Sequence, residues 1–446
     1  MNKIDLTKGK VLSVLTMLAV PIMGSSLLQF TYNLIDMLWV GSLGSDAIAS
    51  IGSCSFYISL GYSINALAII GCGIKVAHAL GEKNEIKVQR YINSGITLNL
   101  FIGIFYGIIL ILFGKNIIGF LGLNNIKVES QAYNYLIINA PILIISFFNL
   151  LYTRILSSYG NNKLSFKING IGVVINIILD PIFIYVLNFG VVGAAISTLM
   201  ANIIMILIYR LKAHNILSYD FNVKQDYEKI KEIIILGFPI ATQRILFTFI
   251  NIILAKMIAK YGSDAIAAQK IGLQIESVTY MVIGGLNGAI LSFTGQNYGA
   301  KKYDRILKGY NSSLCIGLTY SFTMSLLFFI YGPHIVRLFI REEGTLIIAA
   351  EYLKIIAFSQ VFSAIEMVTN GLFTGIGKPK IPSIISITFT VLRIPMALAF
   401  MKYYGLTGVW MSIAASSILK GITAYMVYII HIRKDYKNVR EVKSII

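Results

Sequence analysis

Charged residues are scarce in this chain. Only 13% of its 446 residues are Asp, Glu, Lys or Arg, whereas 56% are hydrophobic, and the mean hydropathy is +0.75. So few polar side chains cannot form the surface of a water-soluble protein. The alternating ten-residue segments that build a membrane barrel are also missing, so helices must satisfy the backbone groups in lipid. The composition predicts an all-α integral membrane protein.

Metal-binding, redox and nucleotide motifs are missing too. The three cysteines and four histidines stand at no metal or redox spacing. No phosphate-cradling loop, nucleophile elbow or carboxylate-rich loop for a metal–diphosphate substrate is found. We therefore predict a protein that is not an enzyme and has no cofactor, and any pumping must draw on an ion gradient.

Long apolar runs are what the chain has instead. Stretches of twenty or more apolar residues recur from end to end, each long enough to cross a bilayer as a helix. Lys and Arg gather in alternate connections, which the positive-inside rule places in the cytoplasm. The pattern predicts about twelve spans with both termini cytoplasmic. It also explains the net charge of +18 without nucleic acid.

The second half of the sequence repeats the first. Pro239 follows Pro21 by 239 − 21 = 218 residues, and the segment GSDAIAA at Gly262 follows GSDAIAS at Gly44 by 262 − 44 = 218. Six spans in each half give two lobes of one orientation, related by a pseudo-two-fold axis along the membrane normal. The expected organisation is an N-terminal lobe at 1–213, a cytoplasmic linker at 214–230, a C-terminal lobe at 231–432 and a basic cytoplasmic tail at 433–446.

Two acids lie inside apolar spans of the first half. A charge at the centre of a span costs about 2.5–3.5 kcal/mol, so such a residue usually faces a partner, water or a substrate. Asp180 follows Asn176 by one helical turn, and Thr198 comes on the next span. Counted from the connections, all of these and Asp36 fall in the outer half of the membrane. Their oxygen atoms predict one site for Na⁺ or for a shared proton.

The repeat supports this interpretation over a role in packing alone. Asp36 matches Leu254, and Asp180 falls near Ile394. A fold that needed both acids for packing would need them in both halves. We therefore expect the first half to hold the coupling ion.

The second half carries charges of its own. Glu366 lies within a span, and two interpretations remain open, a contact with a cationic substrate or a pair with an arginine such as Arg244 or Arg393. Glu276 is interpreted as structural. The residues expected to line a substrate cleft are Glu366, Asn33 and Gln29.

Three segments carry a family resemblance. LAVPIMGSSLLQFTYNLIDMLWVGSLGSDAIASIG, NIILDPIFIYVLNFGVVGAAIST and GQNYGAKKYDR resemble the multidrug and toxic compound extrusion (MATE) family of secondary transporters, closer to its DinF-like branch. The resemblance implies export of small organic, often cationic, compounds in exchange for H⁺ or Na⁺. It also implies a monomer in the prokaryotic inner membrane. By motif match, the family's N-lobe cation site falls on Asp36, Asn176, Asp180 and Thr198.

The resemblance is incomplete in the second half. The two acids that the NorM-like branch uses there fall on Phe247 and Ser363, with Glu366 one turn away. A coupling role for Glu366 is therefore not carried over.

Other functions make different demands on the sequence. A lipid-linked oligosaccharide flippase of the same superfamily is the alternative, and it would favour a cleft with several arginines and often fourteen spans. A membrane enzyme such as a prenyl transferase would need clustered Asp or His near a cytoplasmic loop, the opposite side from these acids. A purely structural scaffold would not explain acids kept in one repeat only. We expect a multidrug exporter that is embedded in the membrane and in contact with its lipids.

Overall fold

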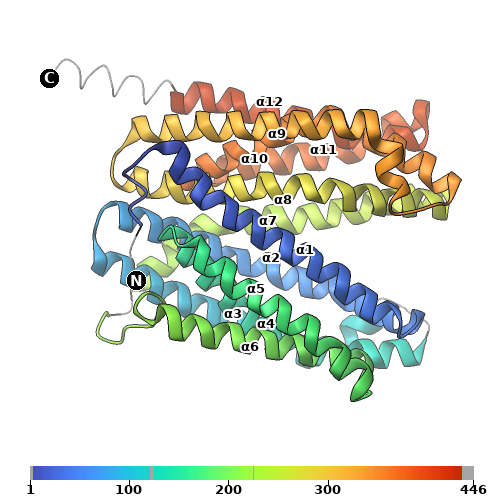
Figure 1. Ribbon diagram of the computed structural model, residues 1–446, viewed down its shortest axis with the longest axis horizontal. Coiled ribbons are helices and arrows are strands. Elements are labelled where there is room, and N and C mark those ends of the chain that lie inside the picture. Colours follow the sequence, from blue (N-terminus) through green and yellow to red (C-terminus); the bar gives the residue numbers. More distant parts are fainter. Residues whose placement is uncertain (1–3, 121–124, 225, 434–446) are drawn as a thin grey trace. The chain divides into compact units, whose positions relative to one another are not determined.

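The structure is a computed structural model that describes residues 4–120, 125–224 and 226–433 (Figure 1). Helices account for nearly all of these residues, and no strand occurs among them. The helices are α1 (Val11–Gly41), α2 (Ser45–Gly81), α3 (Glu85–Gly119), α4 (Ile126–Ser158), α5 (Asn162–Pro181), α6 (Gly190–Leu217), α7 (Tyr227–Ile258), α8 (Ser263–Gly299), α9 (Tyr303–Arg337), α10 (Glu343–Gly375), α11 (Lys380–Tyr404) and α12 (Leu406–Tyr428). Short helical turns extend three of them, at Ile182–Val186 after α5, Ala259–Tyr261 after α7 and Ile429–Arg433 after α12.

All 12 of these helices are long and apolar enough to cross a membrane. Large apolar side chains such as Phe101, Leu112 and Leu398 are more than 60% exposed, which suits a surface in contact with lipid tails. The expected all-α fold with about twelve spans is therefore confirmed. The expected basic tail lies, apart from residue 433, outside the described residues.

The chain divides into two compact units. One contains Gly24–Ala241, and the other contains Leu6–Met23 together with the chain from Thr242 onward. The division falls inside α1 and inside α7, in each case two residues past a proline, Pro21 or Pro239. The two points of division are themselves one repeat apart, since 241 − 23 = 218.

Close packing explains why α1 and α7 are divided. In the first unit, the beginning of α7 packs on α2 so closely that a Cβ atom at Gly237 would lie 2.5 Å from the carbonyl carbon of Leu67. In the second unit, the beginning of α1 packs on α8, where a Cβ atom at Gly285 would lie 3.2 Å from the backbone nitrogen of Met23. Glycine allows such approach of two backbones. The lobes expected at 1–213 and 231–432 stay a prediction. The compact units differ from them because the beginning of α1 belongs to the second unit and the beginning of α7 belongs to the first.

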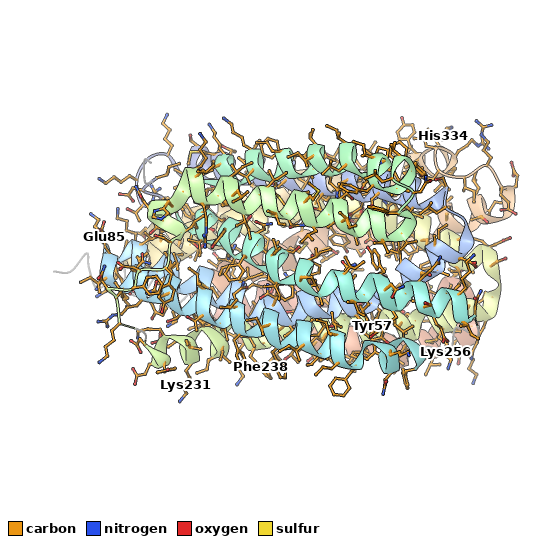
Figure 2. All side chains as sticks on the ribbon, turned by 90° about the horizontal axis from the view of Figure 1, so that it is seen from below. Tyr57, Glu85, Lys231, Phe238, Lys256 and His334 are labelled. Atoms are coloured by element: carbon orange, nitrogen blue, oxygen red, sulfur yellow. The ribbon has the colours of Figure 1, made fainter. Side chains whose placement is uncertain are left out.

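Polar contacts hold the chain before α1 in the second unit. Lys302 Nζ donates to the carbonyl oxygen of Thr7 at 2.8 Å, and Arg305 Nη1 donates to that of Gly9 at 2.7 Å. In the first unit, Glu232 of α7 pairs with Lys75 of α2. Figure 2 shows ionisable residues at helix ends within each unit, with Glu85 and Lys231 at one end of the first unit and Lys256 and His334 at one end of the second.

The backbone repeats as the sequence does. Gly44 before α2 has φ 97° and Gly262 before α8 has φ 100°, a conformation that glycine adopts without steric cost. Lys83 and Lys301, which follow the ends of α2 and α8, both have φ 57°. Positions 218 residues apart thus make the same turns, and the two-lobe repeat is present in the structure.

Candidate functional site

Asp180 lies at the end of α5, where the helix geometry changes. Pro181 follows it directly and has no N–H to donate, and the chain then continues in the π-helical turn Ile182–Val186. Single π-helical turns of this kind occur often at functional sites. The Asp180 side chain is completely buried, within the first compact unit.

Two donors hold the Asp180 carboxylate. The hydroxyl group of Ser197, on α6, donates to Oδ1. The amide of Asn176 fits its neighbours when Nδ2 donates to Asp180 Oδ2 at 3.0 Å and Oδ1 accepts from the backbone N–H of Thr198 at 3.1 Å. Asn176, Asp180 and Thr198 are thereby joined in one hydrogen-bonded group between α5 and α6.

Two residues of this group were missed by the sequence reasoning. Ser197 is completely buried, but its type and spacing do not distinguish it from a serine that only packs. Tyr32 reaches the group from α1, with its hydroxyl oxygen 3.4 Å from Thr198 Oγ1. Tyr32 lies one helical turn before Asp36, and this spacing is the sequence signal that could have placed both side chains on the same face of the helix.

Asp36 is half-buried and differs from Asp180 in its surroundings. It lies within electrostatic range of Asp180, and Tyr32 and Tyr135 lie within range of Asp36. No hydrogen bond to the Asp36 carboxylate is formed within the described part of the chain. Its oxygen atoms are therefore open to a proton or a cation. Residues 4–120, 125–224 and 226–433 hold no cluster of three or more His, Cys, Asp and Glu that could bind a metal.

The matching positions of the second half are apolar, one of them buried and the other partly buried. Leu254 is 1% exposed and belongs to the hydrophobic core of the second unit, and Ile394 packs against that core. The interval is 254 − 36 = 218 for the first acid and 394 − 180 = 214 for the second. At the positions where the first unit holds acids, the second unit thus has apolar side chains that belong to its core or pack against it.

Of the three residues expected to line a substrate cleft, two belong to the first compact unit and one to the second, and the cleft stays a prediction. Gln29 and Asn33 are neighbours on α1, with Gln29 Nε2 donating to Asn33 Oδ1 at 3.2 Å. Glu366, on α10, belongs to the other compact unit. Glu276 is buried on α8 and accepts from the Tyr352 hydroxyl at 2.8 Å and from Gln360 Nε2 at 3.1 Å, as suits a structural residue.

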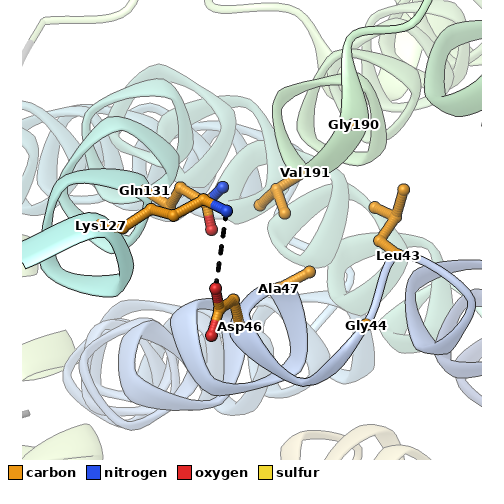
Figure 3. A pocket seen from close by; sticks show the side chains of 8 residues that line it. All are labelled: Leu43, Gly44, Asp46, Ala47, Lys127, Gln131, Gly190 and Val191. Carbon is orange, nitrogen blue, oxygen red and sulfur yellow. Dashed lines mark ion pairs between the residues drawn. The ribbon is translucent and has the colours of Figure 1, made fainter. Parts of the chain in front are cut away.

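A pocket of about 320 Å³ lies in the first unit, at the end that contains the α1–α2 connection (Figure 3). It is formed by the α1–α2 connection and the beginnings of α2, α4 and α6. Across it, Lys127 Nζ lies 3.7 Å from Asp46 Oδ2. None of the four residues predicted to bind the cation lines this pocket.

Known proteins resemble this chain over nearly its whole length. It is 26% identical over 442 residues to the Probable multidrug resistance protein YoeA of Bacillus subtilis, covering 95% of this chain and 94% of that protein. It is 26% identical over 440 residues to the Multidrug export protein MepA of Staphylococcus aureus, covering 96% and 95%. The fold matches that of a MOP superfamily transporter from Pyrococcus furiosus with a TM-score of 0.90 at 23% identity, over 97% of this chain and 98% of that one.

The MatE family model matches both halves of the chain. The matched segments are residues 21–182 and 239–399, which contain Asp36, Asn176 and Asp180 and the corresponding helices of the second half. The match confirms the resemblance that the sequence segments indicated. The chain belongs to the MatE family of membrane transporters.

Proposed function

We propose that this protein is a secondary multidrug exporter that moves small organic compounds across the cell membrane in exchange for H⁺ or Na⁺. The relatives YoeA and MepA carry the names of multidrug resistance and export proteins. We also propose that it acts as a monomer in the prokaryotic inner membrane with both termini in the cytoplasm. The distribution of lysine and arginine supports that orientation.

The observation that carries the proposal is the difference between the two acids of the first unit. Asp180 is held by Ser197 and Asn176, whereas the Asp36 carboxylate accepts no hydrogen bond within the described residues. Two carboxylates within electrostatic range in a buried site repel each other, so a bound proton or cation between them is favoured. Asp36 would receive the ion, while Asp180 would supply a fixed second charge.

The donor set suits either ion. Na⁺ prefers hard oxygen ligands, and Asp36, Asp180, Asn176 and Thr198 all carry them. A proton needs only a carboxylate with an open oxygen atom, which Asp36 has. Neutralising Asp36 removes a charge from a span, and this change can bias the transporter between its outward- and inward-open states.

Ethidium efflux from proteoliposomes tests the proposal. Separate H⁺ and Na⁺ gradients are applied to wild type, Asp36→Asn and Asp180→Asn, and the gradient that drives wild type identifies the ion. Both variants should lose driven efflux while they still fold and bind ethidium. If both pump at the wild-type rate, the acids only pack and the proposed site is wrong. If wild type moves neither ethidium nor other cations under either gradient, multidrug export is wrong and the flippase alternative gains.

A further inference from the structure

Two buried cations lie in the second compact unit. Arg393 is on α11 and 6% exposed, and Lys420 is on α12 and 3% exposed. The two are close enough to interact electrostatically. An arginine keeps its charge in any protein environment, and a cation inside a span is costly unless an anion compensates it. Such residues usually face a partner or a ligand.

The contacts of Arg393 are with neutral groups. Its Nε donates to Ser416 Oγ at 2.5 Å, and Nη2 donates to Ser417 Oγ at 3.3 Å. The ring of Phe247, on α7, lies 5.8 Å from the guanidinium carbon. Neither Arg393 nor Lys420 forms an ion pair with any residue that the structure describes. The guanidinium fork is thus held in place by hydroxyl groups without being neutralised by them.

Two acids lie within electrostatic range of these cations. Glu276 interacts with Arg393, but its carboxylate already accepts hydrogen bonds from Tyr352 and Gln360. Glu366, on α10, is half-buried and interacts electrostatically with Lys420, and it forms no ion pair with any of the described residues. The two acids lower the free-energy cost of burying the cations. Within the described residues, however, neither acid accepts a hydrogen bond from Arg393 or Lys420.

We propose that Arg393 and Lys420 form a binding site for an amphipathic organic anion, one that carries a carboxylate or phosphate group next to an apolar body. A guanidinium fork matches two oxygen atoms of such a group, and an ammonium group adds a second charge. Phe247 is 43% exposed and offers an aromatic face to the apolar body. All of these residues belong to one compact unit.

The repeat supports this assignment. Arg393 stands one residue before Ile394, the position that matches Asp180 of the first half. The related helices α5 and α11 therefore present a carboxylate in the first unit and a guanidinium in the second. This proposal does not rest on ion-coupled export, because binding of an anion requires no gradient.

Equilibrium binding of radiolabelled 2-naphthoate to the purified full-length protein tests the site. Unlabelled 2-naphthoate should compete at least tenfold better than 2-naphthamide, which has the same ring but no charge. Arg393→Gln and Lys420→Gln should each weaken binding at least tenfold. Lys402→Gln, a change of an exposed lysine on the same helix, is the matched control and should bind as wild type does.

Two outcomes would overturn the proposal. Equal competition by the acid and the amide would show that only the ring is recognised. Unchanged binding in both variants would show that Glu276 and Glu366 already neutralise the cations. Should Arg393→Gln fail to fold, Arg393→Lys replaces it, since it keeps the charge and loses the fork, and its expected loss of affinity is smaller than that of Lys420→Gln.

The natural source of the anion is decided in lipid nanodiscs. Binding of 2-naphthoate is measured in phosphatidylcholine alone and with phosphatidylglycerol added. Competition by phosphatidylglycerol that disappears in Arg393→Gln would support the site and identify the headgroup of an anionic lipid as its occupant, since phosphatidylcholine carries a phosphate but no net charge. Unchanged binding of 2-naphthoate would support the site and identify a soluble organic anion.

Discussion

The hydroxyl group of Ser197 lies against the carboxylate of Asp180 and donates a hydrogen bond to its Oδ1 atom. Because Asn176 takes the other oxygen atom, Asp180 is fixed in one orientation at the junction of α5 and its π-helical turn. Asp36 lies within electrostatic range of Asp180, and its carboxylate accepts no hydrogen bond from the described residues. The first unit thus presents one anchored acid beside one open acid, an arrangement suited to binding and releasing a single cation.

Replacing Ser197 should destabilise the protein more than replacing its counterpart in the repeat. Ser197→Ala leaves a buried carboxylate oxygen without its donor, so we expect a loss of about 1.5–3 kcal/mol in the free energy of unfolding. Ser412, at 412 − 197 = 215, is also fully buried but donates only to the backbone carbonyl of Val409. Ser412→Ala should cost about 1 kcal/mol or less.

Equilibrium unfolding in mixed micelles of mild detergent and SDS measures both changes. Similar losses for the two variants would mean that the carboxylate contact of Ser197 adds nothing beyond that of an ordinary buried hydroxyl group. The Asp180 side chain would then not depend on Ser197 for its position.

Asn176 connects Asp180 to the backbone of Thr198, so its removal should affect coupling. Asn176→Leu keeps the volume and removes both hydrogen bonds, and we expect ion-driven efflux to fall about tenfold or more, as the loss of about 1.5–3 kcal/mol implies. Thr390, at 390 − 176 = 214, is the buried counterpart in α11. Thr390→Val is the control and should stay within about twofold of wild type.

The measurement is the initial rate of efflux from proteoliposomes, with ethidium binding in detergent measured in parallel. Loss of binding together with efflux would contradict a role in coupling and would indicate a general structural role. A Thr390→Val variant as defective as Asn176→Leu would lead to the same conclusion.

The helices and the repeat could be predicted because they depend on composition and spacing. A run of twenty apolar residues can satisfy its backbone in lipid only as a helix, and identical intervals such as Pro21 to Pro239 need no knowledge of contacts. The group of Asn176, Asp180 and Thr198 was reached by counting depth along two consecutive spans. Depth along a span is preserved when helices pack, so this count was sufficient.

The remaining features depend on how each helix is rotated about its axis. Ser197 and Thr198 are consecutive, yet only the structure reveals that Ser197 contacts the carboxylate. Likewise, Lys420 looks like any lysine of a late span until its burial beside Arg393 is known. The division of α1 and α7 between two units was also hidden, because it follows from glycine contacts between segments far apart in sequence.

An ion-pair network should stabilise the first unit. Glu232 accepts hydrogen bonds from Lys75, from Lys229 at 2.6 Å and from the Tyr91 hydroxyl at 2.7 Å. Glu232→Gln removes the shared charge from a partly buried site, so we expect a loss of about 1–2 kcal/mol in the free energy of unfolding. The more exposed pair of Lys87 and Glu82 provides the control.

Unfolding at low and high salt distinguishes the two pairs. Glu82→Gln should change the free energy of unfolding by about 0.5 kcal/mol or less. High salt should reduce this small contribution of the Lys87–Glu82 pair further. If Glu232→Gln is as mild as Glu82→Gln at low salt, the network does not stabilise the contact of α7 with α2.

Gly237 should tolerate no side chain. In the structure, a Cβ atom there would lie 2.5 Å from the carbonyl carbon of Leu67 and 2.6 Å from its Cα, and both are backbone atoms that cannot move aside. Gly237→Ala must therefore separate α7 from α2, and we expect it to cost about 1–3 kcal/mol or to prevent folding. Gly52, in the third turn of α2, is the control because a Cβ atom there meets nothing within 4 Å.

Gly52→Ala should leave stability unchanged or raise it by about 0.5–1 kcal/mol, since alanine favours a helix more than glycine does. The folded fraction after detergent extraction, followed by size-exclusion chromatography, compares the two variants even where one fails to fold. A Gly237→Ala variant that is as stable as wild type would contradict the close approach of the two backbones. The beginning of α7 would then not need to pack on the first unit at all, and the division of that helix between the units would lose its physical basis.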